Sequence, residues 1–193
     1  MSEQPKMLTD RISFVRKPDE LTVVITQEIP RAKEAMLFAW LCAWALVGSA
    51  FIYYWRMAPV ASTDRIFFAI STAFWLYFFV RTVKVWLWRR MGKELLRIQG
   101  ETLMIKDAYG RWGKPRDYHT DRVRKFGVIP YDFTKFGQFM DRAFWVIGGE
   151  TLGFDYNGKK IVFGKQLNDR DAVQLARIIE KALREIPARS RRD

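Results

Sequence analysis

The chain has 193 residues but contains a single cysteine, Cys42, and a single histidine, His119. Disulfide frameworks need pairs of cysteines and zinc sites need Cys and His clusters, so neither is expected. The phosphate-binding and hydrolase patterns GxxxxGK[ST], GxGxxG, HExxH and GxSxG are missing too. We therefore expect no metal and no cofactor, and we predict that the protein is not an enzyme.

Three side chains remain as possible catalytic groups. His119 lies beside Tyr118 in a strand-like stretch, Asp155 precedes a turn, and Cys42 lies within a long apolar segment. Catalysis needs a nucleophile, a base and an orienting group in one place. Structural or surface roles are favoured for all three, and an enzyme of unrecognised type is the alternative.

Charge is missing from two long segments. Residues 35–55 contain 21 residues without a charged side chain, and 15 more follow from Ile66. The second run continues to Trp88, interrupted only by Arg81 and Lys84. A 21-residue helix is roughly 30 Å long, the thickness of a bilayer's hydrocarbon core. We predict a transmembrane hairpin over 35–88, with spans at about 35–55 and 66–88; two core helices of a soluble protein are the alternative.

Basic residues flank this hairpin unevenly. Six precede it, four follow within 89–97, and two lie in the loop at 56–65. The positive-inside rule therefore predicts a multi-pass membrane protein with both termini in the cytoplasm. Arg81 and Lys84 either extend to the headgroups or face an anionic lipid or an acidic partner helix.

The net charge is +12, of which residues 93–193 contribute +7. Such an excess suits an anionic leaflet or nucleic acid. No helix-turn-helix, RNP-like or zinc pattern is present, so we expect no nucleic acid and predict contacts with membrane lipids. The candidate lipid contacts are Arg81, Lys84, Arg89, Arg90, Lys93, Arg122, Arg124 and Lys125.

Residues 93–187 have an α+β pattern. Strands are predicted at 94–100 and 102–107, and residues 116–129 alternate like a strand. The clearest signal is 152–164, where Asn157-Gly158 predicts a two-residue hairpin turn. A helix capped by Asn168 and ended by Pro187 follows, then a basic tail at 188–193.

The N-terminal arm, residues 1–34, has strand-like segments at 11–15 and 20–29, joined by a turn at 16–19. Two strands alone are marginally stable in water. We therefore expect this arm to pair with the later sheet, so that the transmembrane hairpin is an insertion within one domain.

The stretch GFDYNGKKIVFGKQLNDRDAVQLARII (153–179) and the order of the parts resemble bacterial two-span membrane proteins with a pleckstrin-homology-like cytoplasmic domain. The resemblance covers most of the chain in layout but only this stretch in sequence. It implies an antiparallel sheet or partly closed barrel capped by the C-terminal helix. It supplies no lipid-binding residues and no activity.

Aromatic residues are candidate contacts with other integral membrane proteins. Trp40 and Trp44 share one face of the first span, and Phe136, Phe139 and Trp145 lie in the aromatic segment 131–149, which is either core or interface. We predict a non-enzymatic binding or scaffold protein, an accessory subunit of a larger complex or a partner in a homo-oligomer. The alternative is an anionic-lipid sensor anchored by the two spans.

Overall fold

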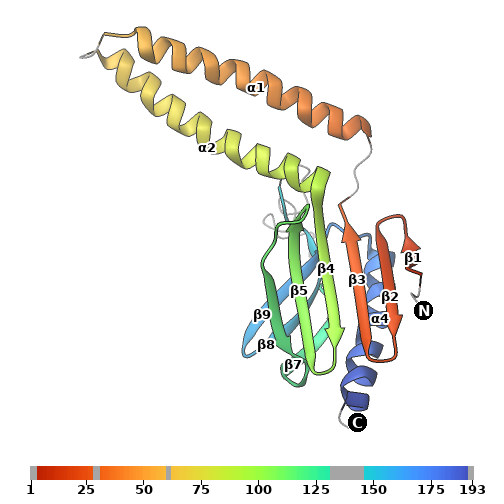
Figure 1. Ribbon diagram of the computed structural model, residues 1–193. Coiled ribbons are helices and arrows are strands. Elements are labelled where there is room, and N and C mark those ends of the chain that lie inside the picture. Colours follow the sequence, from red (N-terminus) through yellow and green to blue (C-terminus); the bar gives the residue numbers. More distant parts are fainter. Residues whose placement is uncertain (1–3, 28–30, 60–61, 131–145, 191–193) are drawn as a thin grey trace. The chain divides into compact units, whose positions relative to one another are not determined.

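The computed structural model describes residues 4–27, 31–59, 62–130 and 146–190 (Figure 1). The chain divides into two compact units. Residues 28–90 form one, called here the helix unit, and residues 1–27 with 91–193 form the other, the sheet unit.

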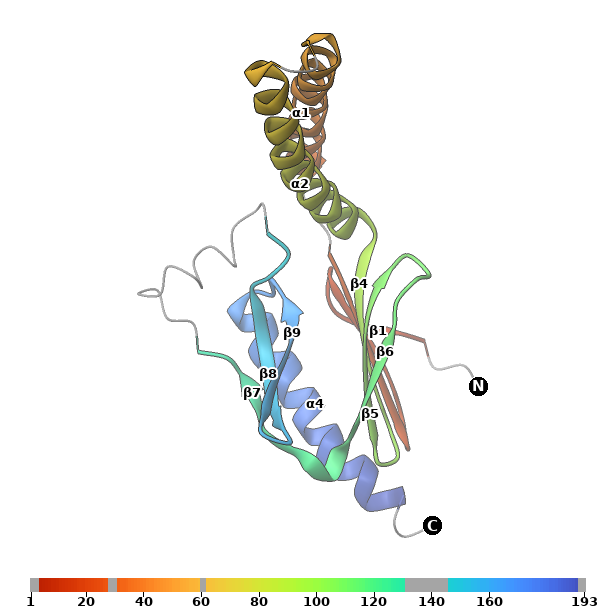
Figure 2. The ribbon, with the colours of Figure 1, turned by 90° about the vertical axis from the view of Figure 1, so that its left-hand side faces the viewer.

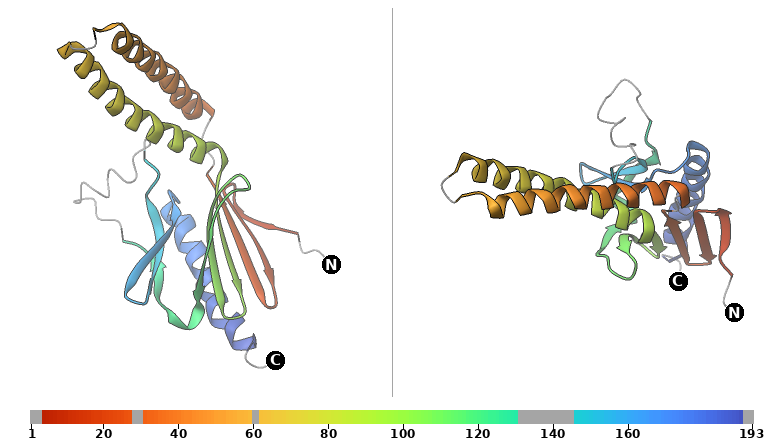
Figure 3. Two further views of the ribbon diagram at one scale, coloured as in Figure 1. Left: turned by 60° about the vertical axis from the view of Figure 1, so that its left-hand side comes forward. Right: turned by 90° about the horizontal axis from the view of Figure 1, so that it is seen from above.

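The helix unit consists of two antiparallel helices, α1 (Arg31–Met57) and α2 (Thr63–Met91), which lie side by side (Figure 3). Each extends beyond its predicted span at both ends. Their most apolar 18-residue windows have mean hydropathies of 2.0 and 1.7, and only 17% and 6% of these windows are buried. Both helices are thus long and apolar enough to span a membrane, and their apolar side chains are largely exposed, unlike those of a soluble core helix.

The sheet unit contains two antiparallel sheets. The first runs in the order β1 (Lys6–Thr9), β2 (Ile12–Lys17), β3 (Glu20–Thr26), β4 (Gly92–Gln99), β5 (Thr102–Tyr109) and β6 (Pro115–His119). The second comprises β7 (Val123–Val128), β8 (Glu150–Tyr156) and β9 (Lys159–Lys165). Among the described residues these sheets remain separate and do not close into a barrel (Figure 2).

The N-terminal strands belong to the same sheet as the strands that follow the helices. β3 pairs with β4 in a continuous register from Glu20 opposite Gln99 to Thr26 opposite Lys93. The backbone N–H of Gln27 also donates to the carbonyl of Gly92 at 3.2 Å. The expected pairing of the arm is therefore confirmed, and the helix unit is inserted between two neighbouring strands.

One core fills the space between the sheets and the last helix, α4 (Asp169–Ser190), which contacts β3 and β4 of one sheet and β7 and β8 of the other. Period-two alternation turns Leu21, Val23 and Ile25 of β3 inward. Helical spacing does the same for Leu175 and Ile179 of α4. The buried members of this core are Ile12, Leu21, Val23, Ile25, Leu96, Ile98, Leu103, Ile105, Tyr118, Leu152, Phe154, Phe163, Leu167, Ala172, Leu175, Ala176, Ile179, Ala182 and Ile186.

The turn at Asn157-Gly158 is confirmed. Both residues have positive φ, 48° and 78°, as a type I′ turn requires, and they join β8 to β9. Two other local expectations are wrong. The strand-like stretch 116–129 is split by a 3₁₀ turn at Thr120–Arg122, so β6 and β7 belong to different sheets. Pro187 lies inside α4, which continues to Ser190; the φ of about −65° that its ring imposes is compatible with a helix, at the cost of the N–H donor it lacks.

Candidate functional site

The two helices of the helix unit are held together at a notch in α1. Gly48 lies directly under the ring of Trp75 from α2, and a Cβ at position 48 would come within 1.9 Å of that ring. The Trp75 indole also donates from Nε1 to the carbonyl oxygen of Trp44 at 2.8 Å. The small residue thus lets a large aromatic ring reach the opposite backbone, which is how small residues favour close helix packing.

The two tryptophans predicted as partner contacts lie on α1. The rings of Trp40 and Trp44 are stacked, with centroids 5.9 Å apart, and Trp40 is 49% exposed. The other predicted partner contacts, Phe136, Phe139 and Trp145, lie outside the described residues, as does most of the aromatic segment 131–149.

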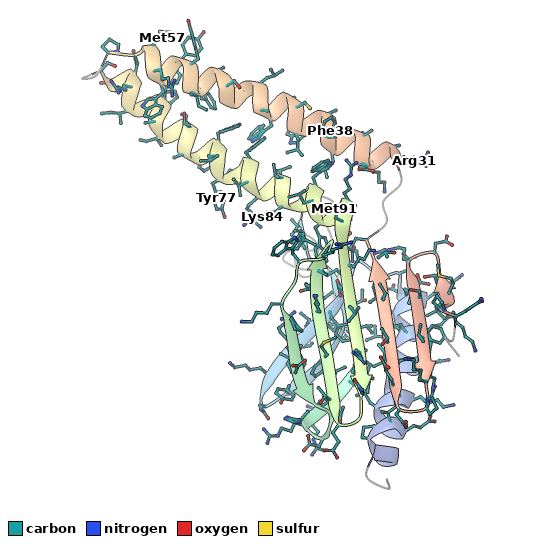
Figure 4. The ribbon with its side chains drawn as sticks, viewed as in Figure 1. Arg31, Phe38, Met57, Tyr77, Lys84 and Met91 are labelled. Carbon is teal, nitrogen blue, oxygen red and sulfur yellow. The ribbon has the colours of Figure 1, made fainter. Side chains whose placement is uncertain are left out.

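Arg81 and Lys84 are both exposed on α2 (Figure 4 labels Tyr77 and Lys84). The Arg81 guanidinium lies toward Tyr77: its Nη1 donates to the Tyr77 hydroxyl at 3.4 Å, and its Cζ is 6.0 Å from the ring centroid. Because Tyr77 precedes Arg81 by one turn, the guanidinium extends toward the middle of the helix. No carboxylate of the described residues forms an ion pair with it.

The remaining predicted lipid contacts fall at two separate places. Arg90, at the end of α2, pairs with Glu34 at 3.8 Å and lies over the Trp86 ring at 5.4 Å. Arg89 precedes it, half-buried, and Lys93 is exposed at the start of β4.

Arg122, Arg124 and Lys125 lie at the opposite end of the sheet unit. At one end of the first sheet, Gly92 of β4 is opposite Tyr109 of β5. At the other end, Thr102 of β5 is opposite His119, the last residue of β6, and from there the chain continues to Arg122. An eight-residue strand is roughly 25 Å long. The structure therefore does not bring these three residues onto one surface with Lys93.

The sheet unit also contains a buried charged cluster near the Gly92 end. Glu94 occupies an inward position of β4 and is 2% exposed. Its carboxylate accepts the backbone N–H groups of Gly164 at 2.6 Å and Lys165 at 3.0 Å, and lies 3.5 Å from the Lys165 Nζ. The same Nζ is 3.0 Å from Asp107, which also pairs with Arg116. This cluster joins the first sheet to β9 of the second.

Burial and charge shift the acid–base behaviour of the cluster. Burial raises the pKa of the Glu94 carboxyl, and the Lys165 ammonium and the two backbone donors offset part of that rise. Burial alone would lower the pKa of Lys165, but Glu94 and Asp107 outweigh it and raise that pKa. The lysine is therefore held in its charged form by two carboxylates.

Arg11 and Gln27 form a second group of polar contacts at the Gly92 end of the sheet unit. The Arg11 guanidinium donates to the carbonyls of Thr26 at 3.1 Å and Gln166 at 2.7 Å, and the Gln27 amide donates to the carbonyl of Lys165 at 3.2 Å. These bonds fix the end of β9 against the point where the chain leaves for the helix unit. Their partners are backbone groups, which is typical of a structural role.

The groups considered for catalysis are not gathered into a site. Asp155 faces Lys125 at 3.8 Å across β7 and β8, and His119 is exposed at the end of β6. Cys42 is exposed on α1, in the other unit. Within the described ranges no group of three or more His, Cys, Asp and Glu side chains could hold a metal ion.

Two features of the Gly92 end were not predicted from the sequence. Glu94 occupies an inward position in the alternation of β4, a signal readable from the sequence. The turn Tyr109–Lys114 carries Trp112, which is 84% exposed, and its YGRWGK pattern was equally readable. Comparison with protein families, curated proteins and solved structures finds no match.

Proposed function

We propose that this chain is a bacterial inner-membrane protein anchored by α1 and α2, with a pleckstrin-homology-like sheet unit on the cytoplasmic side. In this proposal it is not an enzyme. It acts as a binding or scaffold protein, an accessory subunit that associates with a larger membrane protein complex. Its partners are membrane lipids and other integral membrane proteins.

Membrane anchoring is supported by the exposure of the apolar helix surface. Phe67, Ile70 and Phe74 of α2 are 61%, 65% and 67% exposed, so none of the described residues covers this apolar stripe. Contiguous apolar surface of this kind is unfavourable in water and normal in lipid. Tyr53 and Tyr54 near the outer end of α1 suit the aromatic belt at a membrane interface.

A protein partner within the bilayer is supported by one observation, the direction of Arg81. Tyr77 is the central residue of α2, and Arg81 lies about 6 Å further along the axis. With the helix centred in a hydrocarbon core of about 30 Å, this places the guanidinium well inside the core. Its side chain extends toward Tyr77 and away from the headgroups beyond Met91. A carboxylate or amide from a neighbouring helix would complete this site, because intramembrane charges pair with buried partners.

The test is native purification in a mild detergent with sizing and mass spectrometry, comparing wild type, Arg81→Gln and Lys84→Gln. Lys84 is the matched control because it is a cation less than one turn closer to the headgroups. We expect wild type and Lys84→Gln to co-migrate stoichiometrically with a larger complex. Arg81→Gln should weaken that association at least about tenfold, corresponding to about 1.4 kcal/mol.

Migration of wild type as a monomer or small homo-oligomer would overturn the accessory-subunit proposal. It would favour the alternative function, an anionic-lipid sensor anchored by two helices. That alternative is supported by the exposed Lys93 beside Arg89 and Arg90, where the chain leaves α2. Equal association by the two variants would show that Arg81 is not the contact.

A further inference from the structure

The turn between β5 and β6, residues Tyr109–Lys114, presents an exposed tryptophan between two cations. Trp112 is 84% exposed and Tyr109 is 39% exposed. Arg111 and Lys114 flank the tryptophan, both are exposed, and the turn has no acidic residue. An amphipathic ring between cations is the composition that favours the headgroup region of an anionic membrane.

Two backbone hydrogen bonds and two glycines define the conformation of the turn. The backbone N–H of Tyr109 donates to the Trp112 carbonyl at 2.7 Å, and the Trp112 N–H donates back at 3.0 Å. Gly110 has a φ of 59°, which suits a tight hairpin turn. A Cβ on Gly113 would come within 2.3 Å of the Asp107 carbonyl oxygen, so only glycine fits there.

This turn is attached to the end of α2. Tyr109 is the register partner of Gly92, the first residue after α2. The backbone N–H of Gly110 donates to the carbonyl of Met91, the last residue of α2, at 3.0 Å. Met91 itself is 44% exposed, and Lys93 is exposed one residue past Gly92. The turn is therefore held within hydrogen-bond distance of the point where α2 ends.

We infer that the turn Tyr109–Lys114 is a membrane-surface anchor in which Trp112 enters the interfacial layer of the leaflet next to Met91, while Arg111 and Lys114 contact anionic headgroups. This inference rests on the proposed membrane anchoring by α1 and α2.

The experiment uses the full chain carrying Cys42→Ala, reconstituted in vesicles of equal parts phosphatidylcholine and phosphatidylglycerol. Single cysteines at Lys114→Cys, Lys159→Cys or Leu76→Cys carry an environment-sensitive fluorophore. Lys159 is the matched control, an exposed lysine beside the β8–β9 turn at the far end. Leu76 is an exposed position on α2 and reports insertion of the helices.

We expect the Lys114→Cys probe to emit further to the blue than the Lys159→Cys probe, to resist aqueous iodide and to be quenched by spin-labelled lipid. Adding Trp112→Ser should return the Lys114→Cys probe to water-like emission. Tyr109 is left unchanged in every variant, because it pairs with Gly92 between β4 and β5. Replacing phosphatidylglycerol with phosphatidylcholine should weaken the protection, since Arg111, the cation of the turn that remains in the Lys114→Cys chain, then loses its headgroup partners.

The outcomes separate this inference from membrane anchoring itself. A water-exposed Leu76→Cys probe would overturn both. A lipid-quenched Leu76→Cys probe with a freely iodide-quenched Lys114→Cys probe would overturn the anchor alone. A protected Lys114→Cys probe that spin-labelled lipid does not quench would show that a protein surface covers Trp112, which also overturns the lipid anchor.

Discussion

Glu94 shows how one residue joins the two sheets. Its carboxylate accepts from two backbone donors of β9 and pairs with the Lys165 ammonium, whose side chain is 12% exposed. Breaking such a pair on one side leaves an uncompensated buried charge, which costs more than the pair itself contributes. The cluster is therefore sensitive to single substitutions and tolerant of paired ones.

The pH dependence of the unfolding free energy of Lys165→Met tests whether Lys165 compensates the charge of Glu94. Without the ammonium, the pKa of Glu94 in the folded chain rises further above the unfolded value of 4.5. Between those two pKa values the folded state holds a proton that the unfolded state has released, so stability falls as pH rises. Wild type shows the same fall up to its own raised Glu94 pKa, so we expect the deficit in unfolding free energy of Lys165→Met relative to wild type to grow as pH rises above that pKa, by about 1.4 kcal/mol per unit of additional pKa shift.

The measurement is denaturant unfolding of the full chain in detergent at several pH values. The control is the double variant Glu94→Gln with Lys165→Met, whose unfolding free energy should lack the pH dependence that Glu94 gives the wild type, because neither of its neutral side chains titrates. A deficit of Lys165→Met relative to wild type that is the same at every pH would contradict a charged Glu94–Lys165 pair.

At the scale of elements, the packing of α1 against α2 depends on the Gly48 notch. Gly48→Val would push Trp75 off the notch and away from the Trp44 carbonyl, because the ring occupies the space a side chain needs. Overpacking of this kind costs about 1–3 kcal/mol. Thermal unfolding followed by near-ultraviolet circular dichroism should show a lower midpoint and an altered tryptophan signal. Ala50→Val, at an exposed position of the same helix, is the control, and equal effects of the two would contradict this packing.

Elements with a strong local signal were predictable from the sequence. The long uncharged runs are helices, Asn157-Gly158 forms the turn, and Asn168 immediately precedes α4, where its carbonyl accepts the N–H of Ala172. Elements decided by distant partners were not. β1 forms because Lys6 and Met7 have Phe14 and Ser13 to pair with, and the strand-like stretch 116–129 breaks because β6 pairs with β5 while β7 pairs with β8.

The candidate site was predictable only in part, for a similar reason. Composition identified the cations and aromatics but not their places along the sheet unit. Lys93 and Arg124 are both cations predicted as lipid contacts, yet the strand register puts them at opposite ends of the sheet unit. The YGRWGK pattern around Trp112 can be read from the sequence, but the position of this turn next to Met91 cannot, because it comes from the hydrogen bond between Gly110 and Met91, which joins residues 19 positions apart.

At the scale of the whole molecule, the pairing of β3 with β4 restricts the possible topologies. These strands precede α1 and follow α2, and their register places both in one sheet. A membrane cannot separate paired strands, so either both helices cross it or neither does. If the helices are in a bilayer, strand pairing predicts that β3 and β4 lie on one side of it, which agrees with the prediction from the flanking charges.

The most direct measurement is cysteine labelling in spheroplasts with a membrane-impermeant maleimide, in a Cys42→Ala chain. Met57→Cys reports whether the C-terminal end of α1 is accessible to the reagent, and Lys159→Cys reports whether the sheet unit is accessible. We predict that Met57→Cys is labelled in intact spheroplasts and that Lys159→Cys is labelled only after lysis. Labelling of both before lysis, or recovery of the protein in the soluble fraction, would contradict anchoring by two spans with a cytoplasmic sheet unit.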